Sequence, residues 1–238
     1  MAVSHVPLLR LNTGAMMPML AIGTGKISPP ASGRRRGRRK ERPARGALLG
    51  LLNASLSIGF RHIDTSEVYP LFDEVGDALR LFPRTEMFLT SKVDPTRKPG
   101  RPGASCRPDG GGCFAAMSAA ANSTVRRLGT HVDLLLLHRP PKREGDGNAQ
   151  CARLRELWRG LEDAYARGLA KAIGLSNCCG PLLECLVGSA RTPPAVLQYM
   201  LHVGMGPAPL GYRQWAKKTW GAEYMAYSVR TDARIEET

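Results

Sequence analysis

The feature that most constrains the fold of this 238-residue sequence is a regular alternation of short apolar runs with segments of helical periodicity. Residues 132–138 (VDLLLLH) are almost wholly apolar, which is typical of a strand buried on both faces of a parallel sheet. Residues 151–167 carry the clearest apolar stripe at helical spacing. Strands that alternate with helices in this way predict consecutive βαβ units around a parallel sheet.

Seven strands and six helices are predicted after an N-terminal β-hairpin at residues 7–18. The strands cover residues 19–25, 61–65, 87–93, 132–138, 170–177, 195–203 and 223–228. The helices cover residues 44–59, 72–82, 114–128, 151–167, 181–190 and 212–220. No large break separates these units, which favours a single domain over residues 1–238.

Two α/β architectures fit such an order. A (β/α)8 TIM-type barrel is typically about 250 residues long. The predicted elements are one strand and two helices short of it, so we expect a barrel truncated or internally deleted after the seventh strand. A doubly wound open sheet is the alternative, but its Gly-x-Gly-x-x-Gly fingerprint is absent, because Gly23-Thr24-Gly25 is followed by Lys, Ile and Ser.

Half of the formal net charge of +14 comes from one short run. Residues 34–45 (RRRGRRKERPAR) hold eight basic residues and one acidic residue. A polyanion contact or a nuclear-import signal is one interpretation. We favour a solvated basic Pro/Gly/Arg-rich loop insert at residues 28–45, and no nucleic-acid partner, because no aromatic residue interrupts the run. Residues 97–112 are predicted to form a second, flexible Gly/Pro loop.

Composition excludes several classes of protein. A hydrophobic content of 43% and a charged content of 23% argue against general disorder. No uninterrupted apolar run reaches the roughly 18 residues of a membrane-spanning helix, and the N-terminus does not resemble a signal peptide. We therefore expect a cytoplasmic protein with no membrane partner. The six cysteines lack zinc-site spacing and Cys-x-x-Cys motifs, so we expect reduced thiols and no metal site.

Polar residues collect where the predicted strands end. They are Asp64 and Tyr69 after the second strand, Lys92 at the third, His138 at the fourth, Ser176-Asn177 at the fifth, Gln198 within the sixth and Tyr227-Ser228 at the seventh. In barrels of this type the chemistry takes place at the carboxyl ends of the strands. A lysine and a histidine that each end an apolar strand are not required by packing, which favours a catalytic site there.

The residue types in this cluster suit one kind of chemistry. A tyrosine with its ordinary pKa near 10 is a poor proton donor unless a nearby cation stabilises the phenolate. A lysine held by a carboxylate supplies that cation, and a histidine orients a substrate oxygen. The group is suited to protonating an oxygen on which negative charge develops, as in reduction of a carbonyl group by hydride from a cofactor.

Five stretches of the chain resemble the aldo-keto reductase family, and together they run from about residue 7 to residue 228. GFRHIDTS at 59–66 is similar to the family's first signature. Leu161, nine further residues and KAIGLSN at 171–177 are similar to its second. Supporting stretches are TSK at 90–92, LLHRP at 136–140 and AYS at 226–228.

The resemblance implies a role for each polar residue of the cluster. Tyr69 is expected to be the general acid and Lys92 to stabilise its phenolate, while Asp64 pairs with Lys92 and His138 orients the carbonyl group. The implied cofactor is NADPH and the substrate a small carbonyl compound. The implied cofactor contacts are Ser176, Asn177 and Gln198 on the nicotinamide carboxamide, Tyr227 stacked on the ring, Thr24 lining the site and Ser228 near the pyrophosphate.

The chain departs from the family pattern around the expected pocket. Where the family often has Trp after the catalytic histidine, this chain has Arg139. At two other positions where the family often has an aromatic residue, this chain has Gly25 and Cys178. Leu71 and Phe72 replace the usual Asn-Glu pair. The pocket is therefore predicted to be less aromatic and more basic, which favours an acidic carbonyl substrate.

In the family, a C-terminal motif binds the 2′-phosphate of the cofactor. The last ten residues of this chain resemble that motif only in part, at Arg230-Thr231 and Arg234-Ile235. Without an eighth strand, the sheet is expected to have two open parallel edges, and the chain is expected either to be marginally stable or to have a partner or homologous chain that covers the open edge. Two alternatives to a reductase stay open at this point. One is an inactive remnant that acts as a binding or regulatory module, and the other is a nucleic-acid-associated protein that binds through residues 34–45.

Overall fold

The computed structural model describes residues 6–25, 45–94, 106, 112–142, 147–178, 180–202 and 210–229. The predictions for residues 28–44, for most of 97–112, and for Cys179, Arg230 and Arg234 lie outside these residues. No helix among those described is both long and apolar enough to cross a membrane.

A two-stranded antiparallel hairpin precedes a seven-stranded parallel sheet whose strand order follows the chain order. The strands are β1 (Leu8–Arg10) and β2 (Met16–Pro18) in the hairpin, then β3 (Ile22–Gly23), β4 (His62–Asp64), β5 (Phe88–Val93), β6 (Leu134–Leu137), β7 (Ile173–Ser176), β8 (Val196–Met200) and β9 (Glu223–Tyr227) in the sheet. The helices are α1 (Arg45–Ser57), α2 (Phe72–Leu79), α3 (Cys113–Leu128), α4 (Gly147–Ala166), α5 (Pro181–Glu184) and α6 (Leu210–Trp220). The alternation read from the sequence is thus confirmed.

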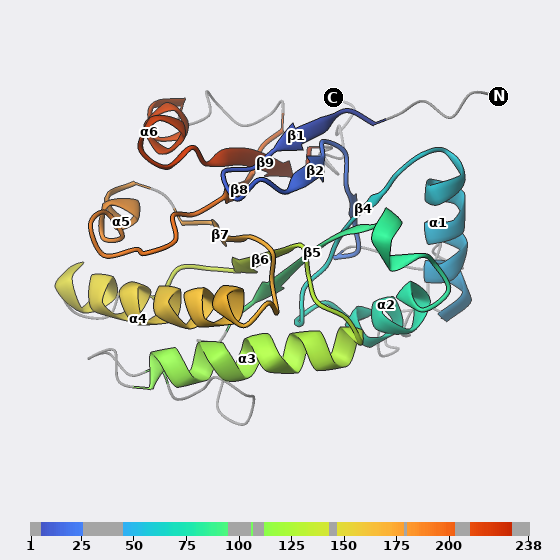
Figure 1. The fold of residues 1–238 in the computed structure, drawn as a ribbon, viewed down its shortest axis with the longest axis horizontal. Coiled ribbons are helices and arrows are strands. Elements are labelled where there is room, and N and C mark those ends of the chain that lie inside the picture. Colours follow the sequence, from blue (N-terminus) through green and yellow to red (C-terminus); the bar gives the residue numbers. More distant parts are fainter. Residues whose placement is uncertain are drawn as a thin grey trace, which may run out of the picture.

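The helices lie on one side of the sheet and leave its other side to face inward. Helices α3 and α4 run next to each other along the sheet, with α1 and α2 beside its first strands and α5 and α6 beside its last (Figure 1). Parallel neighbours joined through helices require this placement, because each crossover packs back on the same side of the sheet. The result is the layered arrangement of a (β/α) barrel.

Strand β6 shows how one apolar run serves two cores. All four of its leucines are fully buried. Leu135 and Leu137 pack with the residues of the helical layer, whereas Leu134 and Leu136 pack inside the sheet with Phe88. Since successive strand residues point to opposite faces, only a strand covered on both sides reads as an unbroken apolar run.

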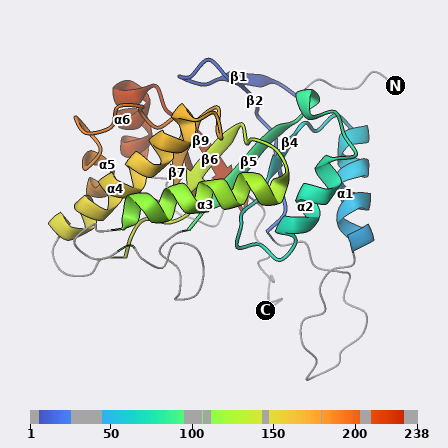
Figure 2. The same cartoon turned by 60° about the horizontal axis from the view of Figure 1, so that its bottom comes forward.

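The hairpin closes the end of the sheet at which the strands begin. The side-chain amide of Asn12 donates to the carbonyl oxygens of Pro194 (3.0 Å) and Trp220 (2.9 Å), which precede β8 and β9. The carbonyl oxygen of Pro18 lies 3.0 Å from Nδ1 of His62, the first residue of β4. The hairpin, at the top of Figure 2, therefore contacts both the early and the late strands. Among the described residues β3 pairs only with β4 and β9 only with β8, as expected for an open sheet.

Strand β3 and helix α5 fall furthest short of their predicted lengths. Strand β3 has two residues instead of seven, because its parallel register with β4 extends over only Ile22 and Gly23. Helix α5 ends at Glu184 instead of Ala190, since the next amides bond three residues back in tighter turns and Gly188 takes a positive φ of 73°.

The prediction that the cysteines are reduced thiols is wrong for four of them. The structure contains the disulfides Cys106–Cys113 and Cys151–Cys185. The second joins the first turns of α4 to the end of α5 across 34 residues. Sequence spacing cannot reveal such a pair, because the two sulfur atoms meet only when the helices pack. Among the described residues Cys178 lies outside both disulfides, and it is buried.

Candidate active site

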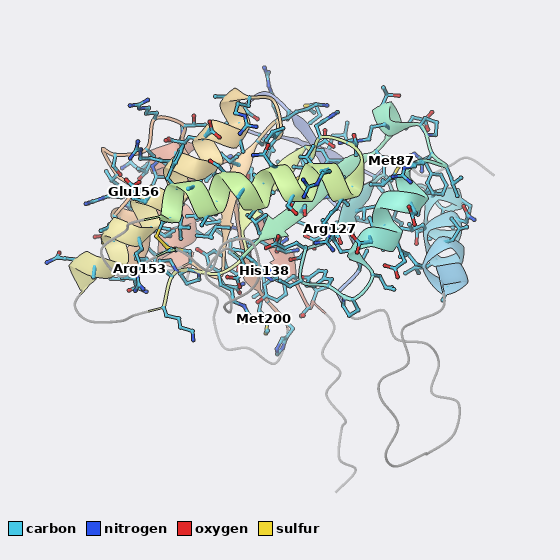
Figure 3. All side chains as sticks on the ribbon, turned by 90° about the horizontal axis from the view of Figure 1, so that it is seen from below. Met87, Arg127, His138, Arg153, Glu156 and Met200 are labelled. Atoms are coloured by element: carbon cyan, nitrogen blue, oxygen red, sulfur yellow. A yellow bond between two sulfur atoms is a disulfide. The ribbon has the colours of Figure 1, made fainter. Side chains whose placement is uncertain are left out.

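The residues singled out at the strand ends meet around one cavity of about 880 Å³. Its lining residues are Gly23, Gly25, Asp64, Val68, Tyr69, Pro70, Lys92, His138, Arg139, Pro140, Ser176, Asn177, Gln198, Met200, Tyr227 and Ser228. In Figure 3, His138 and Met200 lie at the opposite end of the sheet from Met87, which precedes β5. The cavity thus opens where the strands end, as the sequence predicted.

A buried ion pair forms the base of the cavity. The ammonium group of Lys92 donates to Oδ1 of Asp64 and to the carbonyl oxygen of Thr65, the latter at 3.2 Å. The other carboxylate oxygen, Oδ2, accepts a 2.7 Å hydrogen bond from the side-chain amide of Gln198. Lys92 is only 3% exposed, so its charge remains in a site of low dielectric constant and faces the cavity.

Tyr69 lies over this ion pair. Its ring centroid is 5.2 Å from Nζ of Lys92 and 5.8 Å from the ring of His138, which it meets edge to face. A turn after β4 holds it, through the bond from its amide to the carbonyl oxygen of Ser66 (2.9 Å). Gly25 makes room for the ring, because a Cβ atom there would lie 2.9 Å from Cζ of Tyr69.

Sequence reasoning missed one residue of this cluster, Ser66. Its hydroxyl oxygen lies 2.9 Å from Nδ1 of His138 and 3.1 Å from the carbonyl oxygen of Lys92. The single hydroxyl hydrogen of Ser66 is donated either to the carbonyl oxygen of Lys92 or to Nδ1 of His138, and the second arrangement requires the ring proton of His138 to be on Nε2. Ser66 is the last residue of the signature at 59–66, but the sequence holds no signal that pairs it with a histidine 72 residues further on.

The residues expected to bind the cofactor form a second polar group along the cavity wall. Asn177, which has a positive φ of 58°, donates from Nδ2 to the carbonyl oxygen of His138 (2.9 Å) and to Oγ of Ser176 (3.1 Å). Its Oδ1 accepts a 2.6 Å bond from the hydroxyl of Tyr227. The Ser176 hydroxyl donates to Oε1 of Gln198 at 3.4 Å.

Burial raises the pKa of the Tyr227 phenol, and the neighbouring Tyr69 acts in the same direction. Arg139, Lys92 and the hydrogen bond to Asn177 oppose that rise. Tyr227 is therefore a neutral hydrogen-bond donor at neutral pH.

Two further predicted residues behave differently. Ser228 lines the cavity and has a positive φ of 51°. Thr24 is 1% exposed and does not line it, because its hydroxyl donates to the hydroxyl of Thr65 (2.9 Å). Leu71 and Phe72, where the family pattern has Asn-Glu, are buried in the core beneath the helices and not at the cavity.

The fold and the site together define a parallel (β/α) barrel with an Asp, Tyr, Lys and His cluster at the carboxyl ends of its strands. The sequence pattern described as the Aldo/keto reductase family matches residues 23–229. The chain belongs to the aldo-keto reductase family.

Known proteins similar to this chain are members of the same family. It is 30% identical over 238 residues to aldo-keto reductase family 1 member A1 of Cricetulus griseus and 29% identical to that of Homo sapiens. Each of these matches covers 92% of this chain but 63% of the relative, so the chain spans less than two thirds of the relatives' length.

Solved structures of the family share the fold. An aldo/keto reductase of Brucella melitensis superposes with a TM-score of 0.71 at 25% identity, over 94% of this chain and 73% of that one. A Bombyx mori aldo-keto reductase, solved in complex with NADP, superposes with a TM-score of 0.68 at 26% identity, over 94% of this chain and 66% of that one.

Proposed function

We propose that this chain reduces an aldehyde or ketone to an alcohol, with NADPH as the hydride donor and Tyr69 as the general acid. The observation that carries the proposal is the buried Lys92–Asp64 pair beneath Tyr69 and beside His138 at one cavity wall. A buried cation is costly unless it is paired, and one that also faces a cavity next to a phenol is suited to stabilising a phenolate.

The proposed roles of the four residues follow from their positions. As the carbonyl carbon accepts a hydride, negative charge develops on its oxygen, and Tyr69 donates its phenolic proton to that oxygen. Lys92 stabilises the resulting phenolate, and Asp64 holds Lys92 in place. His138 donates a hydrogen bond that orients the substrate oxygen. Solvent returns a proton to Tyr69, so one proton from solution is consumed for each alcohol formed.

The second polar group fits the nicotinamide end of the cofactor. A carboxamide offers one acceptor and two donor hydrogens, and Ser176, Asn177 and Gln198 present hydroxyl and amide groups that match them. We propose that Tyr227 stacks on the ring and that Ser228 lies near the pyrophosphate. When bound, NADPH supplies the hydride. The NADP complex of the Bombyx mori relative supports this choice of cofactor.

The first experiment is a titration of the purified protein with NADPH, followed by cofactor fluorescence, with NADH as the comparison. We expect micromolar binding that prefers NADPH. The next step is turnover on a panel of aldehydes and ketones. Tyr69→Phe is expected to lower kcat by at least about a hundredfold through loss of the general acid. Tyr165→Phe, a half-buried tyrosine on α4, is the matched control and should keep full activity.

A second candidate is a binding module without turnover. It is favoured by the way the cofactor-facing groups already bond to one another, since Gln198 donates to Asp64 and Asn177 accepts from Tyr227. These bonds satisfy the polar atoms without a ligand. A cooperatively folded sample that binds no NADPH would support this candidate and remove the reductase proposal.

A further inference from the structure

The charge on the cavity wall is not balanced. Of the lining residues with a permanent charge, Asp64 and Lys92 pair with each other, which leaves Arg139. Within the part of the chain that the structure describes, no carboxylate forms an ion pair with Arg139. Its side chain is exposed, but it faces the cavity closely enough to act electrostatically on the phenol of Tyr227.

The chain places the backbone of Arg139 next to that of His138. It directly follows His138, the residue proposed to orient the carbonyl oxygen, so the two side chains start about 3.8 Å apart at their Cα atoms. Both line the cavity. A guanidinium group there is within reach of a second functional group on the same small substrate.

Part of the cavity wall is apolar. Val68, Pro70, Pro140 and Met200 line the cavity and offer no hydrogen-bonding side chain. In Figure 3, Met200 and His138 are labelled at the same end of the sheet, and both line the cavity. A ligand that fits has a carbonyl group for His138, an apolar body for this wall and an anionic group for Arg139.

We propose, on the basis of the proposed reductase function, that Arg139 is a specificity-determining residue that selects carbonyl substrates bearing a carboxylate. The planar guanidinium of arginine matches the two oxygens of a carboxylate and binds them with charge-assisted hydrogen bonds. Because the group is partly exposed, the selectivity is moderate, about tenfold for one such contact.

The test compares two substrates that differ only in this charge, 4-carboxybenzaldehyde and methyl 4-formylbenzoate. We expect kcat/KM to be about tenfold higher for the acid than for the ester, mainly through KM. Arg139→Met should bring the ratio close to one, and Arg139→Lys should keep part of it. Arg159→Met removes an exposed arginine on α4 and is the matched control, which should leave the ratio unchanged.

A binding measurement separates failure of this inference from failure of the proposed function. Terephthalate, which has the shape of the acid substrate but cannot be reduced, is titrated calorimetrically into the wild type and Arg139→Met. About tenfold weaker binding to the variant supports the inference even if neither aldehyde is turned over. Equal terephthalate binding, or an unchanged ratio between the two aldehydes, overturns it.

A third measurement addresses the other source of an anionic group, the cofactor phosphates. NADPH is titrated into the wild type and Arg139→Met. An NADPH Kd that rises about tenfold in the variant, with terephthalate binding unchanged, assigns Arg139 to the cofactor and also overturns the inference. An unchanged NADPH Kd together with weaker terephthalate binding supports it.

Discussion

Two buried carboxylates lie at opposite ends of the same sheet, and their surroundings differ. Asp133, just before β6, is 5% exposed and accepts bonds from Arg84 (2.7 Å), Lys171 (3.1 Å) and the backbone amide of Leu89 (2.8 Å). Asp64, at the end of β4, is 7% exposed and accepts from Lys92 and Gln198. The side chains of Arg84 and Lys171 are 21% and 56% exposed, whereas that of Lys92 is 3% exposed.

The difference shows how one fold separates stability from chemistry. At the amino ends of the strands, Asp133 ties the loop carrying Arg84 to β5 and β6 through a backbone amide and cations whose charge is partly hydrated. At the carboxyl ends, the cation paired with Asp64 is dehydrated and faces a cavity. In barrels of this kind the first end serves stability and the second serves catalysis.

Removal of the Asp133 carboxylate is the largest expected effect. Asp133→Ala leaves the Leu89 amide and two cations without their acceptor, and should lower the free energy of unfolding by about 3 kcal/mol. Urea denaturation measures the loss. Asp73→Ala, which removes an exposed partner of Arg127, is the control and should cost less than about 1 kcal/mol. A fall in the kcat of folded Asp133→Ala protein would contradict the division between the two ends.

The opposite pattern is expected at the other carboxylate. Asp64→Asn keeps the size of the side chain and an acceptor for Lys92, so the loss of stability should be smaller than for Asp133→Ala. The proposed reaction should suffer more, with kcat lower by about a hundredfold, because Lys92 is no longer held by a negative charge beneath Tyr69. Steady-state kinetics and urea denaturation on the same sample check both halves. A larger effect on unfolding than on kcat would show that Asp64 is mainly structural.

Much of the fold was predictable because strands and helices of this barrel are local patterns. The apolar run of β6 and the stripe of α4 each follow from one stretch of sequence, and the order of the strands follows from the shortness of the connections. The strand-end residues Asp64, Lys92 and His138 were predictable for the same reason, since the carboxyl ends of parallel strands meet at one edge of a sheet.

What the sequence did not reveal depends on contacts between distant segments. The Cys151–Cys185 disulfide, the bond from Gln198 to Asp64 and the bond between Ser66 and His138 each join segments at least 34 residues apart. Each requires the register of strands and the rotation of helices, which no local pattern carries. The family resemblance implies that Thr24 lines the cofactor site; the structure shows its hydroxyl bonded to that of Thr65, a contact between distant segments of the chain.

A third prediction concerns pH at the amino ends of the strands. His62 is 1% exposed, with Nδ1 on the carbonyl oxygen of Pro18 and Nε2 2.7 Å from the hydroxyl of Thr90. Burial lowers its pKa, although the Pro18 contact and the charges of Asp64 and Asp133 oppose this and Lys92 adds to it. Below the ordinary histidine pKa near 6.5, His62 is protonated in the unfolded chain but stays neutral in the folded chain. The free energy of unfolding therefore falls as the pH falls.

The slope contributed by His62 is at most about 1.4 kcal/mol per pH unit, the value for one proton. Urea denaturation between neutral and mildly acidic pH measures it. His62→Gln cannot titrate and should flatten the slope in this range, whereas His202→Gln, which alters a histidine after β8, should not. An identical slope in wild type and His62→Gln would show that carboxylates alone carry the acid dependence.

The smallest expected effect on activity is that of a substitution at Ser66. It tests whether the same kind of contact, between a hydroxyl and a buried histidine, serves different roles at the two ends of the sheet. His62 and His138 are both buried, and each lies beside a hydroxyl group. The Thr90 hydroxyl contacts His62, which is structural, whereas the Ser66 hydroxyl contacts His138, which lines the cavity. Ser66→Ala removes the hydroxyl that lies beside Nδ1 of His138, and kcat should fall about fivefold with little change in stability.

Ser66→Thr keeps the hydroxyl and should restore most of the activity, which a purely steric role for Ser66 would not allow. The pH profile of kcat adds a second readout, because loss of the Ser66 hydroxyl removes a hydrogen-bond partner of Nδ1 on the ring of His138. A Ser66→Ala variant with unchanged kcat and an unchanged profile would mean that the Ser66 hydroxyl does not orient His138. The hydroxyl would then belong with the structural contacts at the other end of the sheet.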